Sequence, residues 1–108
     1  MSVENTTVVD AIGVERDSDK VILTISDHLD WSDERAHLLA LQEKINTYLR
    51  FIESGEIDET YADALGRARV IDVVTKHPLT DGALEFFRKA TAVLHDAGVE
   101  LRTRVLSE

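Results

Sequence analysis

The side chains best suited to chemistry in this chain lie together in one five-residue segment. Asp27, His28, Asp30 and Trp31 supply two carboxylates, an imidazole and an indole within it. A further histidine, His77, stands directly before the chain's single proline. Carboxylates and imidazoles are the groups that most often exchange protons with a substrate or bind a transition metal. These five residues are therefore the first candidates for a functional site.

Three functional interpretations compete for these residues. In the first, Asp27, His28 and His77 hold a divalent metal, because nitrogen and oxygen ligands suit zinc, iron or manganese. In the second, the same three residues and Asp30 provide a histidine–carboxylate pair for acid–base catalysis. In the third, Trp31 and the neighbouring acids anchor a protein partner, since tryptophan is enriched at binding hot spots.

A purely structural role competes with all three, and we favour it over the two chemical interpretations. Asp27 can accept hydrogen bonds from turn amides, Asp30 can stabilise the approach to a helix, and Trp31 can pack over the core beside it. Two histidines without a recognised ligand spacing do not define a metal site, and none of the common catalytic motifs occurs. We therefore expect no metal and no cofactor. His37 and His95, which fall on predicted helices, are interpreted as ordinary surface residues.

Hydrophobic periodicity predicts the elements that position these residues. Four strands are expected, at residues 6–14, 20–26, 67–76 and 99–106. A long helix has Ser32 as its N-cap and ends at Gly55, and a second helix starts after Thr80 or Asp81 and ends at Gly98. The long helix carries one apolar stripe, formed by Leu38, Leu41, Ile45, Tyr48 and Ile52.

The order strand, strand, helix, strand, helix, strand predicts the fold class. Two amphipathic helices and a half-apolar sheet bury their apolar sides together as a two-layer α+β sandwich, with a four-stranded mixed sheet and two helices on one face. The length of 108 residues fits a single domain, residues 1–108, in which residues 56–66 form a link.

A helical crossover should run the strands at 20–26 and 67–76 parallel to each other. Their carboxyl ends then meet at one edge of the sheet, where ligands bind in open sheets with helical crossovers. The sequence therefore predicts one candidate binding edge, formed by Asp27, His28, Asp30, Trp31 and His77.

The composition excludes several classes of protein. There is no cysteine, which removes disulfides, thiolate metal sites and a cysteine nucleophile. Acidic residues number 21 against 12 basic ones, and the net charge of −9 opposes binding to nucleic acid or to anionic membranes. The longest apolar run is residues 38–41, whereas a membrane-spanning helix needs roughly 20 residues. With no signal-peptide pattern near its start, the chain is expected to be cytoplasmic.

The segment Ile25–Trp31, which reads ISDHLDW, resembles a motif of a known family, as does the helix that follows it with Gln42–Asn46. The family consists of small bacterial domains of unknown function marked by an ISDHLDW-type motif. The resemblance covers nearly the whole chain, including the strand at 67–76. It implies membership of this family and brings no activity, substrate or catalytic residue with it.

The leading functional hypothesis is a non-enzymatic protein-binding domain, immunity-like or regulatory, whose acidic surface meets a basic protein partner. Small size, the charge of −9, a single tryptophan beside carboxylates and the absence of catalytic motifs support it. One alternative is a small metal-dependent or acid–base enzyme that uses Asp27, His28, Asp30 and His77. The other is a structural homodimer, joined through the long helix or an unpaired final strand.

Overall fold

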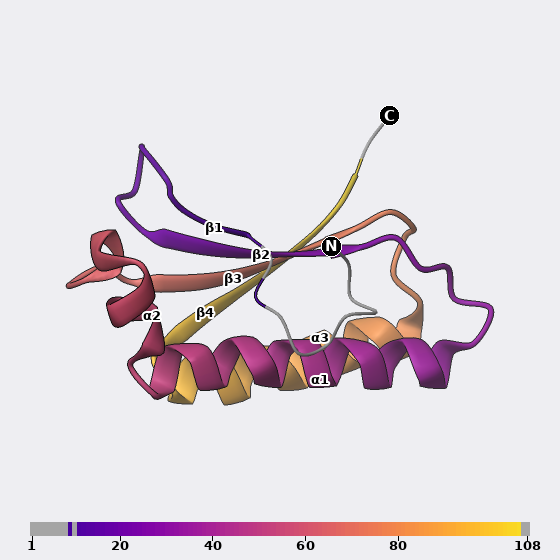
Figure 1. Cartoon of the computed structure of the whole chain (residues 1–108). Coiled ribbons are helices and arrows are strands. Elements are labelled where there is room, and N and C mark those ends of the chain that lie inside the picture. The colour runs from indigo at the N-terminus through magenta and orange to yellow at the C-terminus, as the bar shows by residue number, and fades with distance from the viewer. Residues whose placement is uncertain (1–8, 10, 107–108) are drawn as a thin grey trace.

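The chain forms the predicted strands and both predicted helices (Figure 1). A short helical segment lies between the first of these helices and the third strand. A computed structural model describes residue 9 and residues 11–106. In chain order the elements are β1 (Ala11–Val14), β2 (Val21–Asp27), α1 (Glu34–Glu53), α2 (Glu56–Thr60), the 3₁₀ turn η1 (Ala62–Ala64), β3 (Arg69–Thr75), α3 (Asp81–Asp96) and β4 (Val99–Val105). The expected link at 56–66 thus contains α2 and η1.

The four strands form one sheet in the order β1-β2-β3-β4, which the sequence alone did not establish. β1 and β2 are an antiparallel hairpin, whereas β2–β3 and β3–β4 are parallel pairs. Helices α1 and α3, which make the two crossovers, lie on the same face of the sheet (Figure 1). The predicted α+β class, with a mixed sheet and two helices covering one side, is confirmed.

The core lies between the sheet and the two long helices. In β2, Val21, Leu23 and Ile25 are buried, as the alternating pattern predicts. From α1, Leu41, Ile45, Tyr48 and Ile52 pack against them, together with Phe87 and Leu94 of α3. The Tyr48 hydroxyl donates a hydrogen bond of 2.7 Å to the carbonyl of Thr24, which ties α1 to β2. This packing holds the start of α1 in a fixed position over the carboxyl end of β2.

Helix ends follow the predicted signals with one exception. Asp33, not Ser32, is the N-cap of α1, because its carboxylate accepts a hydrogen bond of 3.1 Å from the amide of Ala36. Thr80 caps α3 as expected. Gly55, which follows the end of α1, adopts the left-handed conformation with φ of 84°. The first strand is described only from Ala11, so the predicted stretch 6–8 and residue 10 lie outside the described residues.

The second face of the sheet carries cross-strand charge pairs. Lys20 pairs with Glu100 at 3.0 Å, and Arg102 bridges Glu15 at 3.2 Å. Arg104 of the edge strand β4 contacts the buried carboxylate of Asp72 on β3 at 3.2 Å. Within the described ranges, none of the helices has the length and apolar character that a bilayer crossing requires.

Candidate functional site

The candidate edge lies where β2 and β3 end side by side. Asp27 is opposite Thr75 in the parallel register, and the amide of Lys76 donates a hydrogen bond of 2.8 Å to the carbonyl of Asp27. The β2–α1 loop and the β3–α3 loop leave this edge together (Figure 1). The predicted parallel pairing is therefore confirmed, and it brings His77 next to the segment that contains Asp30 and Trp31.

Asp27 is held inside the protein at the last position of β2. Its side chain is completely buried, and its Oδ2 lies 2.5 Å from Nε2 of His37, whose side chain is 2% exposed. Its other oxygen, Oδ1, accepts a hydrogen bond of 3.1 Å from the amide of Leu29. A buried carboxylate is costly unless its oxygens are hydrogen-bonded, and here both oxygens have partners.

The hydrogen bond made by Nδ1 of His37 determines how many protons the Asp27–His37 pair holds. Nδ1 lies 2.9 Å from the backbone carbonyl of Asp30. A carbonyl can only accept, so Nδ1 carries a hydrogen, and one further proton lies between Nε2 and the carboxylate of Asp27. Either a charged imidazolium donates to a carboxylate, or a carboxylic acid donates to a neutral imidazole. In both forms, both ring nitrogens are engaged within the chain.

Trp31 covers the buried pair. Its indole stacks on the His37 ring with a centroid distance of 3.8 Å and an interplanar angle of 22°. Trp31 and Leu29 are partly buried and pack against the hydrophobic core. The aspartate, the histidine and the tryptophan thus fix the loop between β2 and α1 from the inside, so the expected structural roles of Asp27 and Trp31 correspond to contacts that are present.

Asp30 is an exposed acid of this loop. Its carboxylate accepts hydrogen bonds from the Ser32 hydroxyl at 2.7 Å and from the Ser32 amide at 3.0 Å. These two bonds, and to a smaller extent the electrostatic influence of His77 and His37, hold the pKa of Asp30 below its ordinary value of 3.8. Asp30 therefore carries a negative charge at all ordinary pH values.

Glu34 joins the two helix starts at this edge. The hydroxyl of Thr80 donates a hydrogen bond to its carboxylate and accepts one of 3.1 Å from the amide of Ala83. A Cβ added at Gly82 would lie 2.8 Å from Oε1 of Glu34, so the missing side chain makes room for this carboxylate. An anion from within the chain therefore lies at the start of α3, where a bound anion would be favoured.

The most buried histidine of the chain was not among the predicted site residues. His37, expected on the surface, is buried and belongs to the centre of the site, so that prediction was wrong. It stands four residues before Leu41, and thus on the same helix face as the apolar stripe. That spacing was the available signal. His28 is exposed on the loop, and His77 is half-buried.

The metal interpretation lacks an assembled group of ligands in the described part of the chain, and the buried histidine at this edge is not available for acid–base catalysis. Among residues 9 and 11–106, no three or more histidine, aspartate or glutamate side chains form a group that could hold a metal ion. The alternative ligand set of Asp27, His28 and His77 does not form such a group. Acid–base catalysis needs a ring nitrogen that reaches a substrate. Both ring nitrogens of His37 are engaged, by Asp27 and by Asp30, so His37 does not offer one.

Comparison with known proteins gives a family but no function. A model for a family of unknown function matches residues 1–107, which is nearly the whole chain. No curated protein matches, and no solved structure matches.

Proposed function

The chain belongs to DUF6572, a family of unknown function, and from its own surface we propose that it is a non-enzymatic protein-binding domain with a basic protein partner. The observation that carries this proposal is that the aspartate–histidine pair at the candidate edge is buried, whereas charged side chains around it are exposed. The aspartate–histidine pair that would perform chemistry is buried and fully hydrogen-bonded within the chain. Among the charges that face solvent at this edge, Asp30 and Asp33 belong to the loop that this pair holds in place.

The exposed charges around the candidate edge are mainly negative. Arg35 and Lys76 are the exposed basic residues among positions 28–35 and 76–81, and they stand against four exposed acids, namely Asp30, Asp33, Glu34 and Asp81. Opposite charge on a partner would speed its association and favour it over acidic competitors. A loop that is already rigid also loses little conformational freedom on binding.

The proposal also covers the role of the protein, its location in the cell and the kind of partner, as expected from the sequence. The chain would act as an immunity-like or regulatory protein in the bacterial cytoplasm, where it binds a basic enzyme or toxin. Its small size and its net charge of −9 suit such a role. The partner would contact Asp30 and the neighbouring loop, with Trp31 supporting that loop from below.

Affinity capture with the full chain tests the proposal. The immobilised protein is incubated with a lysate of its source organism at low and at moderate salt, and each retained protein is then purified and titrated by calorimetry. We expect a basic partner in stoichiometric amount. Salt should weaken its binding, because screening reduces attraction between exposed charges.

Charge-matched variants locate the surface. Asp30→Asn with Asp33→Asn removes two charges at the candidate edge, and asparagine preserves the helix cap. Asp17→Asn with Asp19→Asn removes two charges from the exposed β1–β2 turn. We expect the first variant to bind the partner at least tenfold more weakly and the second to bind normally. Equal weakening by both variants, or no retained basic protein, would contradict the proposal.

A further inference from the structure

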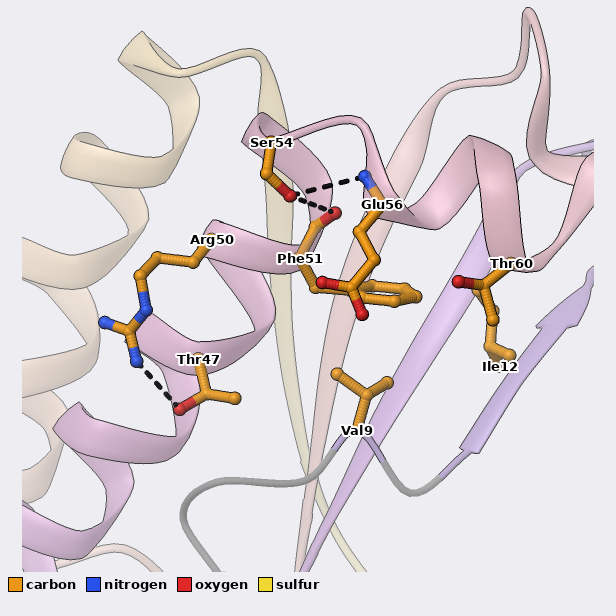
Figure 2. A pocket seen from close by; sticks show the side chains of 8 residues that line it. All are labelled: Val9, Ile12, Thr47, Arg50, Phe51, Ser54, Glu56 and Thr60. Atoms are coloured by element: carbon orange, nitrogen blue, oxygen red, sulfur yellow. Dashed lines mark hydrogen bonds between the residues drawn. The ribbon is translucent and has the colours of Figure 1, made fainter.

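A cavity of about 640 Å³ lies far from the candidate edge, between β1, the second half of α1 and α2 (Figure 2). Its volume is within the roughly 300–1,000 Å³ of typical ligand pockets. The two sites are at opposite ends of α1, whose 20 residues span about 30 Å. The cavity is lined by Val9, Ile12, Thr47, Arg50, Phe51, Ser54, Glu56 and Thr60.

The inner wall of this cavity is apolar and includes an aromatic ring. Val9, Ile12 and Phe51 are partly buried and pack against the hydrophobic core. Figure 2 shows the side chains of Val9 and Phe51 directed into the same space. A ligand that enters would therefore place methylene groups or a flat cation against this wall.

A carboxylate stands at the mouth of the cavity. Gly55, with φ of 84°, turns the chain out of α1, and the amide of Glu56 donates a hydrogen bond of 3.3 Å to the Ser54 hydroxyl. This turn places the side chain of Glu56 on the lining of the cavity, to which Phe51 also belongs (Figure 2). The exposed Arg50 is directed away from Glu56 and donates a hydrogen bond of 3.2 Å to Thr47. The negative charge of Glu56 is thus presented to the cavity.

The surroundings of the mouth are strongly acidic. Residues 53–63 contain five acids and no basic residue. Asp58 is paired with Arg69 at 2.5 Å. Glu53, Glu59 and Asp63 are exposed. Arg50 is the basic residue in the lining and Arg69 is already paired with Asp58, so the acids outweigh the bases around the mouth. This excess of negative charge favours a cation over an anionic or neutral ligand.

We infer that this cavity is a binding site for an arginine side chain of a partner polypeptide. The guanidinium group would lie against the Phe51 ring and pair with the Glu56 carboxylate, while its methylene stem would contact Val9 and Ile12. Arginine suits such a site better than lysine, because its planar group stacks on aromatic rings and is more weakly hydrated. This inference does not depend on the proposed function at the candidate edge.

Nuclear magnetic resonance with the isotope-labelled full chain tests the inference. The probes are N-acetyl-arginine amide and, as a neutral analogue of the same shape, N-acetyl-citrulline amide. We expect the arginine probe to give saturable amide shifts at Ile12, Phe51 and Glu56, with a dissociation constant in the millimolar range that a single side chain reaches. The citrulline probe should give at least tenfold weaker binding.

Three variants and a lysine probe complete the test. Glu56→Gln and Phe51→Leu should each weaken arginine binding at least fivefold. Glu59→Gln removes an exposed charge that contributes to the acidic field but lies outside the cavity lining, so it should weaken arginine binding less than twofold. The amide spectrum shows in each case that the fold is retained. Citrulline binding as tight as arginine, equal loss in the Glu59 variant, or equal affinity for N-acetyl-lysine amide would overturn the assignment.

Discussion

His37 is held through both ring nitrogens and one ring face, so its removal should cost far more than a surface substitution. His37→Ala would leave the Asp27 carboxylate buried, with the partner at its Oδ2 removed, and would unstack Trp31. Breaking a buried pair in this way costs about 3–5 kcal/mol. We therefore expect His37→Ala to lower the free energy of unfolding by that amount, as measured by urea denaturation.

A double variant separates the pair from general damage. Asp27→Ala should also destabilise, but Asp27→Ala with His37→Ala removes both members and leaves no unpaired charge. The loss in the double variant should be at least about 1 kcal/mol smaller than the sum of the two single losses, because residues in contact are not additive. Additive losses would show that the two side chains stabilise the loop independently.

Asp30 offers a prediction about pH. The hydrogen bonds from Ser32 lower its pKa below 3.8, with a smaller contribution from His77 and His37. A lowered pKa means that Asp30 adds stability above the pKa it has in the unfolded chain, and that this contribution is lost as pH falls through the folded value. In Ser32→Ala the carboxyl should titrate closer to 3.8, although the backbone bond remains. A carbon-detected titration measures both midpoints, and an unchanged midpoint would assign the shift to other groups.

At the scale of elements, periodicity predicted the helices but not every residue on their buried faces. The apolar stripe of α1 through Leu41, Ile45 and Tyr48 is the buried face. Lys44 and His37 lie on that face as well and are buried, although their polar heads suggested solvent exposure. Periodicity specifies which positions face the core, whereas the contacts that make burial of a polar group acceptable come from distant residues. For His37 those contacts come from the 27–31 loop.

Two glycines at helix boundaries should respond in opposite ways to alanine. Gly55 has φ of 84°, a conformation that strains any residue with a Cβ, so Gly55→Ala should destabilise by about 1 kcal/mol. Gly82 lies in the first turn of α3, and a Cβ added there would clash only with the flexible end of the Glu34 side chain. Gly82→Ala should stabilise the protein through the higher helix propensity of alanine, by about 0.5–1 kcal/mol, less the cost of displacing the Glu34 carboxylate.

The control for this pair is the Glu34→Ala background. Without the carboxylate, Gly82→Ala should show its full gain of about 0.5–1 kcal/mol in thermal unfolding, while the loss at Gly55 should stay the same. If Gly82→Ala gives the same change with and without Glu34, the carboxylate does not occupy the space beside Gly82 in solution.

For the whole molecule, topology was the part that the sequence predicted best. The preference of helical crossovers for parallel strands was enough to place the ends of β2 and β3 at one edge and His77 near Asp27. The pairing of Asp27 with His37 was not predictable in this way, because it depends on the conformation of the loop at 28–33. The cavity beside Phe51 was equally hidden, since it requires the turn at Gly55 to bring α2 over α1.

The net charge of −9 predicts how stability depends on salt. Repulsion among the 21 acids, which the 12 bases offset only in part, opposes the compact state, and added salt screens this repulsion. We expect the melting temperature to rise by about 2–4 °C between low salt and physiological ionic strength, equivalent to about 0.5 kcal/mol. A variant with Asp17, Glu53, Glu59 and Asp63 changed to their amides has a net charge of −5 and should show a smaller rise. Circular dichroism melts in increasing potassium chloride measure the melting temperatures of both proteins.

Partner binding should weaken over the same range of salt concentration, so salt would stabilise the fold while it weakens the complex. A melting temperature that falls with salt would instead mean that the ion pairs on the open sheet face, such as Arg102 with Glu15, outweigh the repulsion.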